Sequence, residues 1–293
     1  MQSKLAIRFI HTYFIAFSLL FIVPFILIVA VSLSNEQDVT RYGYKLIPMN
    51  WDFTAYRIVF DNPAQMIRSY VVTSLQAVFG TIASVFIMSL SAYPLSRTTF
   101  KWRRPITFFI FFTMLFGGGL IPTYILNTQY FGLGNSFWIY ILPSLANAFH
   151  IIIFRTFFQG LPISIIESAK MDGAGEFRIY WQMILPISKP VLATLALLNV
   201  LGRWNEWYTA LIYIRNENLY TLQYLLQRIL QKAEFIRQMA DQLPTDVDPS
   251  TFQMPTETVR FALAVVAAGP LLFVFPFFQK YFARGLTIGS VKG

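Results

Sequence analysis

Residues 162–190 read PISIIESAKMDGAGEFRIYWQMILPISKP, a polar stretch inside a chain that is otherwise strongly apolar. Ser164 precedes Glu167 by three residues, the spacing of a capping box at the start of a helix. Gly173 can end such a helix, because glycine readily adopts left-handed backbone angles. The stretch therefore predicts a short helix and a turn between two apolar segments.

Around this stretch the composition is that of a membrane protein. The chain has 293 residues, of which 56% are hydrophobic and 13% charged, far from the averages of soluble domains. Six apolar segments are each long enough to cross about 30 Å of hydrocarbon as a helix. We expect spans at about 12–33, 69–94, 105–126, 137–158, 190–213 and 260–280. The sequence predicts an all-α, six-span protein in one domain, 1–293, with the loop 159–189 between the fourth and fifth spans.

The first apolar segment also has features of a signal peptide. Lys4 and Arg8 form a positively charged start, and Ala30-Val31-Ser32 resembles a cleavage site. The apolar run of about 20 residues is longer than the usual core of such peptides. We expect an uncleaved first span.

Basic residues predict the orientation. With both termini in the cytoplasm, the inner segments hold 13 Lys and Arg against 3 acidic residues, and the outer segments hold 9 against 10. The run Lys101-Trp102-Arg103-Arg104 lies in a short inner loop, where the positive-inside rule is strongest. The net charge of +9 therefore reflects topology, and no nucleic-acid partner is expected.

Several chemistries are excluded by the residues that are missing. There is no cysteine, so disulfides, thiolate metal sites and cysteine nucleophiles are ruled out. The two histidines are far apart in sequence and form no ligand cluster. No Walker A pattern and no Ser-His-Asp signature occurs. The chain has no expected catalytic or metal site and no cofactor of its own.

Helix breakers and one amphipathic segment mark the connections. Pro94 closes the second span, and Gly117-Gly118-Gly119 interrupts the third, either lining a cavity or ending a span. Apolar residues between positions 222 and 236 recur at helical spacing, which predicts an amphipathic helix. Residues 243–255 read as a turn-rich loop, either a plain connection or a contact surface.

The fifth span carries polar and aromatic residues at membrane depth. Asn199, Arg203 and Glu206 follow i, i+4, i+7 spacing and would share one helical face. Such residues usually face a bundle interior or a wet path. One interpretation is a solute pathway with sugar-stacking rings, and the other is an Arg203–Glu206 pair that locks helices together. The candidate pathway residues are Asn199, Arg203, Trp204, Asn205, Glu206 and Tyr208.

His150 and Asn147 lie three residues apart in the fourth span. A proton relay through His150 would need a carboxylate in the membrane, and Glu206 is the one candidate. A buried, hydrogen-bonded histidine is the other interpretation, and it is the more common arrangement.

The stretch 162–190 resembles the EAA loop of ABC-importer permeases. That pattern is Glu-Ala-Ala, three residues, Gly, nine residues and Ile-x-Leu-Pro; Ser168 and Met183 depart from it but remain small or apolar. The resemblance implies that this loop couples the chain to separate ATPase subunits. The residues that match the coupling motif are Glu167, Ser168, Ala169, Asp172, Gly173, Ala174, Leu185 and Pro186.

Three classes of function remain: an importer permease, a secondary transporter or channel, and a multi-pass membrane enzyme. A secondary transporter would usually show internal symmetry, which is not evident here. An enzyme should show paired acidic residues at a membrane face, whereas the inner acidic residues Glu167, Asp172 and Glu176 all belong to the EAA-like stretch. The importer interpretation explains the loop, the topology and the missing ATP site together.

The resemblance covers nearly the whole chain and implies a maltose-transporter-like, type I permease of the bacterial cytoplasmic membrane. The implied partners are membrane lipid, a second related permease, two ATPase subunits that bind ATP and Mg²⁺, and an extracellular solute-binding protein. The expected function is oligosaccharide import by alternating access. The Trp204-Asn205 region, residues 222–225 and the tail 285–293 resemble the branch associated with complex, often acidic oligosaccharides.

Overall fold

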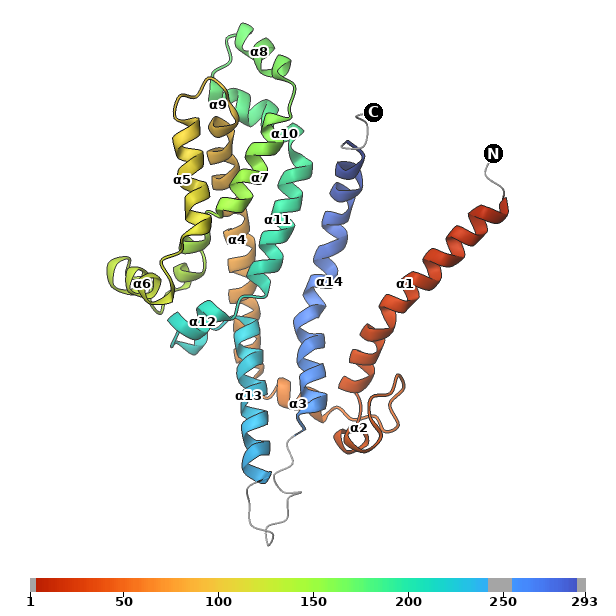
Figure 1. Cartoon of the computed structure of the whole chain (residues 1–293). Coiled ribbons are helices and arrows are strands. Elements are labelled where there is room, and N and C mark those ends of the chain that lie inside the picture. The colour runs from red at the N-terminus through yellow and green to blue at the C-terminus, as the bar shows by residue number, and fades with distance from the viewer. Residues whose placement is uncertain (1–3, 242–254, 289–293) are drawn as a thin grey trace. The chain divides into compact units, whose positions relative to one another are not determined.

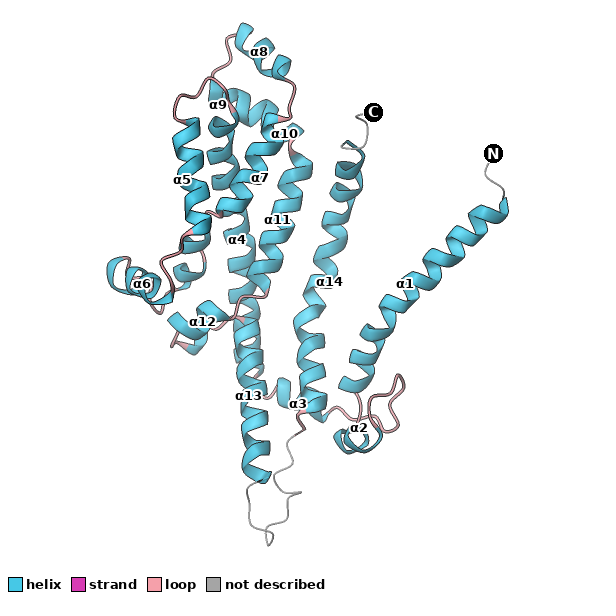
Figure 2. Cartoon of the chain, in the orientation of Figure 1, coloured by secondary structure: helices cyan, strands magenta, loops and turns pink. Residues whose placement is uncertain are grey.

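The computed structural model describes residues 4–241 and 255–288, which form helices joined by turns and short loops (Figures 1 and 2). Within these two ranges no strand occurs, and an isolated bridge pairs Ser34 with Trp51. The predicted all-α class is confirmed. The helices are α1 (Lys4–Ser32), α2 (Glu36–Tyr42), α3 (Thr54–Val59), α4 (Pro63–Ser96), α5 (Arg103–Leu115), α6 (Leu120–Ile125), η1 (Leu126–Tyr130), η2 (Phe137–Tyr140), η3 (Leu142–Ser144), α7 (Ala148–Gln159), α8 (Ile163–Met171), α9 (Glu176–Ile179), η4 (Tyr180–Ile184), α10 (Leu185–Ile187), α11 (Lys189–Trp204), α12 (Tyr208–Tyr213), η5 (Glu217–Leu219), α13 (Leu222–Asp241) and α14 (Glu257–Ile288).

The described residues contain three single helices that could each cross a membrane and three bent pairs that could do so together. The single helices are Arg8–Ser32 in α1, Pro63–Ser96 and Glu257–Val274 in α14. The bent pairs are Arg103–Leu115 with Leu120–Tyr130 (113°), Phe137–Ser144 with Ala148–Gln159 (46°), and Glu176–Ile187 with Lys189–Trp204 (78°). Counting each pair as one span gives six, and each overlaps one predicted span. The sidedness of the termini stays a prediction.

Glycine and proline account for the bends. Gly119 adopts φ +82° in the gap between α5 and α6, a conformation that other residues rarely take. Pro143 lies in η3, ahead of the bend into α7, and Pro190 lies in the first turn of α11. Pro94 does not end α4, which continues for two more residues to Ser96.

The described chain divides into two compact units. The first comprises residues 1–66 and 225–270. In it, the Glu36 carboxylate accepts the backbone N–H groups of Thr256, Glu257 and Thr258 and the Thr258 hydroxyl, at 2.6–3.0 Å. These N–H groups have no partner inside α14, so the carboxylate caps the start of that helix.

The second unit comprises residues 67–224 and 271–293. Its main hydrophobic cluster draws on the spans and on the loop 159–189 together, through Met88 of α4, Phe154 of α7, Ile166 of α8, Tyr180 of η4 and Leu195 of α11. In Figure 1, α4, α7 and α11 lie side by side, and α8 lies beyond one end of them. The loop is therefore packed onto the ends of the spans, which fixes the position of its exposed residues.

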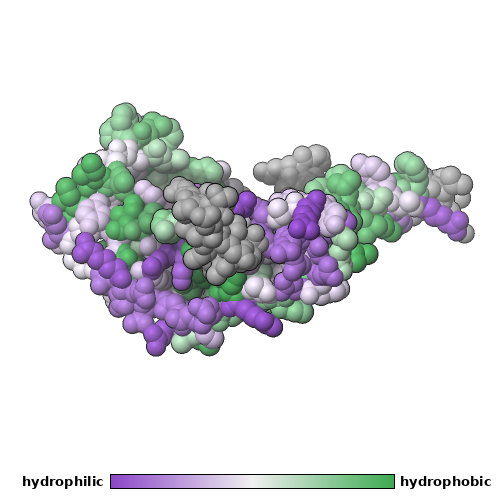
Figure 3. Space-filling view, turned by 90° about the horizontal axis from the view of Figure 1, so that it is seen from below, coloured by the Kyte–Doolittle hydropathy of each residue, from purple (hydrophilic) through white to green (hydrophobic). Residues whose placement is uncertain are grey.

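The predicted amphipathic helix is present as α13. Its apolar residues Leu222, Leu226 and Ala233 are buried, whereas Gln227 and Lys232 between them are exposed. Seen from below, hydrophilic residues gather into patches with apolar residues between them (Figure 3). The predicted turn-rich loop 243–255 lies almost wholly outside the described residues, as does the end of the predicted tail motif, 289–293.

Candidate functional site: the loop between the bent spans

The helix predicted from the EAA-like stretch is α8, but it does not begin with the predicted capping box. Its N-cap is Pro162, and no side chain caps it. Ser164 lies in the second helical position, because the helix already starts at Ile163. Only a residue at the N-cap can accept the free N–H groups of the first turn with its side chain, and Ser164 lies two residues beyond that position. The capping-box prediction is wrong.

The end of α8 is as predicted. Gly173 adopts φ +77°, and its N–H donates to the carbonyl of Lys170 at 3.0 Å. The next N–H, of Ala174, donates to the carbonyl of Ala169 at 2.9 Å. This pair of bonds is a Schellman motif, which satisfies carbonyls that the helix leaves free.

α8 has a buried face and an exposed face. Ile166 and Ala169 are buried in the main cluster of the second unit, and Ala174 packs beside them. Glu167, Ser168 and Asp172 are exposed, and Met171 is 87% exposed. The small residues of the motif thus hold the helix close to the spans, and the polar ones and Met171 face outward.

Three charged and polar side chains link α8 to the end of α4. The Lys170 ammonium lies 2.6 Å from Glu176 Oε1, and the Tyr93 hydroxyl donates to Glu176 Oε2 at 2.7 Å. Tyr93 is buried at the end of α4. Sequence reasoning placed Glu176 in the loop motif but gave it no role, and Tyr93 lies too far away in sequence for any local pattern to reveal the contact.

The loop returns to the membrane through a bent connection. Leu185 packs against the main cluster, and Pro186 is exposed in the short helix α10. The chain then turns by 78° into α11, which begins with Lys189-Pro190. Pro186 and Pro190 therefore both lie where the loop enters the span.

The candidate pathway residues do not share one helical face. α11 ends at Trp204, Asn205 is its C-cap, and Glu206 lies beyond the helix. The i, i+4, i+7 argument assumed a helix through residue 213, and that assumption is wrong. Asn199 remains on α11, where its amide nitrogen lies 3.2 Å from His150 Nδ1 and donates to the carbonyl of Leu195 at 2.9 Å.

Arg203 is buried and bonds the interior of the second unit. Its guanidinium donates to the carbonyls of Tyr140 at 2.9 Å and Ser144 at 3.2 Å and to the Ser84 hydroxyl at 2.7 Å. The two carbonyls belong to the 3₁₀ segment at the bend before α7. Arg203 thus joins α11 to α4 and to this bend without a hydrogen bond to Glu206.

The remaining pathway residues divide between interior and surface. Trp204 is buried, with its ring 6.4 Å from that of Tyr70. Glu206 Oε1 accepts the N–H of Thr209 at 2.8 Å, at the start of α12. Asn205 and Tyr208 are exposed.

Gly80 was not singled out from the sequence, yet it makes room for Arg203. A Cβ atom at Gly80 would overlap the Nη1 atom of Arg203. The sequence could hardly have indicated this role of Gly80, because glycine is common in membrane helices.

No group of histidine, aspartate or glutamate side chains in the described ranges could hold a metal ion. The His150 backbone N–H donates to the Asn147 side chain, which caps α7. His150 is therefore a partly buried, hydrogen-bonded residue rather than part of a ligand cluster.

Fold and site together define a multi-span helical membrane protein with a short exposed helix held on the loop between two bent spans. The chain belongs to the family described as binding-protein-dependent transport system inner membrane component, whose profile matches residues 3–288.

Similar proteins are transport permeases. The polygalacturonan/rhamnogalacturonan transport system permease protein YtcP of Bacillus subtilis (strain 168) is 36% identical over 293 residues, with all of both chains covered. Protein LplC of the same organism is 37% identical over 272 residues, or 93% of this chain and 90% of the relative. A solved structure of a bacterial ABC transporter involved in the import of the acidic polysaccharide alginate matches with TM-score 0.72 and 32% identity, covering 96% of this chain and 98% of that one.

These similarities confirm the predicted class, a type I ABC-importer permease of the bacterial inner membrane. They favour it over a secondary transporter or channel and over a membrane enzyme, because the relatives are transport subunits.

Proposed function

We propose that this chain is one permease subunit of an ATP-driven oligosaccharide importer that works by alternating access. Two ATPase subunits would bind ATP and Mg²⁺, and this chain would contribute no catalytic residue. A second, related permease and an extracellular solute-binding protein would complete the importer. The names of YtcP and of the alginate transporter support a sugar as the solute, and an acidic one in particular.

The observation that carries this proposal is the two-faced helix α8. Its outward residues Glu167 and Met171 would fit a groove on an ATPase subunit. The Glu167 carboxylate would bond an arginine of that groove, and the apolar Met171 side chain would pack on the floor of the groove. Its inward residues pack into the same cluster as α4, α7 and α11. A displacement of α8 by the ATPase would therefore be passed directly to the spans.

The solute pathway is proposed to use the exposed members of the predicted set. Asn205 and Tyr208 offer an amide and an aromatic ring at the surface of the second unit, as sugar hydroxyls and sugar rings require. The Nη1 and Nη2 atoms of Arg203 donate to this chain's own carbonyls and to Ser84, and its Nε atom is buried. A cation for an acidic sugar would then come from elsewhere, such as the second permease.

The docking role of α8 is tested by Glu167→Gln in the assembled importer. We expect weaker retention of the ATPase subunits and slower sugar uptake, by about tenfold for a lost charge-assisted bond. Asp61→Asn, which removes an exposed carboxylate ahead of α4, is the control and should leave both unchanged. Wild-type retention and uptake in Glu167→Gln would refute the role of Glu167.

A further inference from the structure

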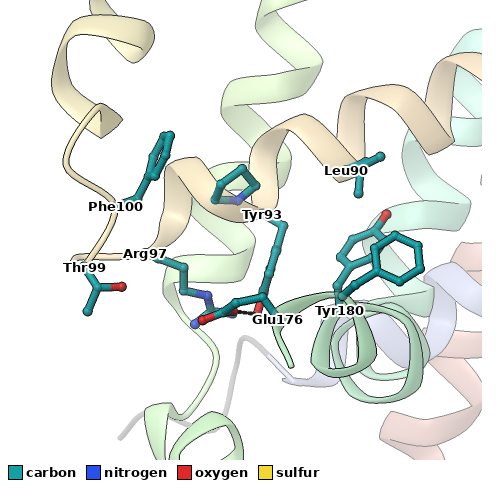
Figure 4. A pocket seen from close by; sticks show the side chains of 9 residues that line it. Leu90, Tyr93, Arg97, Thr99, Phe100, Glu176 and Tyr180 are labelled. Carbon is teal, nitrogen blue, oxygen red and sulfur yellow. Dashed lines mark hydrogen bonds between the residues drawn. The ribbon is translucent and has the colours of Figure 1, made fainter. Parts of the chain in front are cut away.

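A cavity of about 540 Å³ lies beside the C-terminal end of α4, within the second unit (Figure 4). It is separate from the exposed face of α8 and from the candidate pathway residues. Its lining residues come from α4, the turn that follows it, α9 and η4: Leu90, Tyr93, Pro94, Arg97, Thr99, Phe100, Glu176, Phe177 and Tyr180.

Most of the wall is hydrocarbon. Leu90, Pro94 and Phe100 contribute aliphatic and aromatic surface, and Tyr180 contributes its ring. Phe100 and Tyr180 lie on opposite sides in Figure 4. Phe177 is 67% exposed, and its ring stacks on that of Trp181 at a centroid distance of 6.4 Å. An opening with such walls suits a flexible apolar chain, because contact between the apolar walls and water is unfavourable.

One part of the wall is cationic. The Arg97 guanidinium lies 4.6 Å from the centroid of the Tyr93 ring, and its Nε and Nη2 atoms have no hydrogen-bond partner in the described part of the chain. Glu176, the one carboxylate in the lining, is already paired with Lys170 and Tyr93. Arg97 is partly exposed and forms no ion pair with the described residues, so its charge is open to an anion, whereas the carboxylate beside it is largely compensated.

The position of the cavity along α4 matches the edge of a bilayer. The part of α4 without charged residues, 69–96, ends directly before Arg97, and the basic run 101–104 follows. Trp102 in that run is 66% exposed. Tryptophan, tyrosine and basic side chains mark the headgroup level of membranes, and basic pockets at this level bind anionic headgroups.

We propose that this cavity binds one anionic phospholipid, with an acyl chain along the apolar wall and the phosphate on Arg97. The inference needs only that α4 spans the membrane, so it stands apart from the proposed sugar transport. A side chain of a partner subunit could fill apolar space too, but the unpaired guanidinium beside the basic run favours a lipid phosphate.

The test is lipid retention by the purified full-length chain in the assembled importer. The complex is equilibrated in nanodiscs holding equal amounts of phosphatidylglycerol and phosphatidylcholine, and the retained lipids are counted by native mass spectrometry. We expect one retained phosphatidylglycerol, with a preference that falls about fivefold in Arg97→Gln. Arg97→Lys keeps the charge and should keep most of the preference.

Two further variants separate the cavity from general surface attraction. Arg103→Gln removes a cation from the neighbouring run that does not line the cavity and should retain lipid as the wild type does. Leu90→Trp fills the apolar part and should lower the retention of both lipids. Unchanged preference in Arg97→Gln, or an equal loss in Arg103→Gln, would overturn the proposal. So would retention only when the ATPase subunits are absent, because the cavity would then be a protein-docking site.

Discussion

At the scale of single residues, Arg203 shows how a charged side chain is accommodated inside a membrane protein. The bend before α7 leaves carbonyls that the helices do not satisfy, and Arg203 bonds two of them, those of Tyr140 and Ser144. Unsatisfied backbone groups are costly where water is absent. The cation is kept because it supplies donors at this bend, and Gly80 provides the space that it fills.

Arg203→Met should destabilise the subunit by about 1.5–3 kcal/mol, the cost of losing hydrogen bonds to a charged group, because the carbonyls of Tyr140 and Ser144 then keep only their serine hydroxyl donors. We expect lower yield from membranes and a lower melting temperature in detergent by tryptophan fluorescence. Gly80→Leu should cause a similar loss by displacing the same guanidinium. Arg215→Gln, which alters an exposed arginine, is the control. A melting temperature equal to that of the wild type in Arg203→Met would show that these bonds add nothing.

At the scale of elements, some helix ends are fixed by a residue close by in the sequence and others by a residue far away in the sequence. The end of α8 is set by Gly173 within the helix's own sequence. The start of α14 is set by Glu36, which is 220 residues away from Thr256. Tyr44 adds a second link by donating to Glu257 at 3.0 Å. The segment after α1 thus anchors the last long helix.

Glu36→Ala should loosen the first turn of α14 by about 1–2 kcal/mol, because a capping carboxylate at a helix start is lost. Hydrogen–deuterium exchange of peptides covering residues 256–262 should speed up, while exchange in α4 should not. Asp38→Ala, which loses a bond to Asn50, is the matched control in the first turn of the same helix, α2. Equal protection of α14 in Glu36→Ala and the wild type would contradict this account of the cap.

At the scale of the whole molecule, this chain leaves much of its own apolar surface exposed. Phe9, Tyr13 and Leu20 of α1 are more than half exposed, as are Phe108 and Phe109 of α5. Lipid and a second permease are the proposed partners that would cover such surfaces. A solute pathway formed with that permease would use residues that are exposed in this subunit, and Asn205 is one of them.

Asn205→Ala should raise the oligosaccharide concentration needed for half-maximal uptake by about three- to tenfold, the effect of one lost hydrogen bond. Assembly with partner subunits should be unchanged, because within the described residues the Asn205 side chain bonds only Leu201 and Gln223. Uptake of radiolabelled sugar into proteoliposomes measures the first effect, and co-purification measures the second. Gln227→Ala, an exposed amide on α13, serves as the control. Unaltered uptake would place the pathway along other residues.

The sequence by itself determined the all-helical membrane class, the six apolar segments and the short helix ended by Gly173. These features follow from local composition and from one residue's backbone freedom, so they need no distant contact. The family-like motif included Ala169 among the coupling residues, and its place on the inward face of α8 came from the structure.

Only the tertiary structure decided how the charged residues are used. The spacing placed Arg203 and Glu206 on one helical face, and one of the two interpretations paired them. In the structure α11 ends between them, and Arg203 bonds a bend more than fifty residues away in sequence. Glu176 contacts Tyr93, and Glu36 contacts α14, across similarly long separations. A buried charge takes whichever partner the fold brings within about 3 Å, and periodicity along one helix carries no information about that partner.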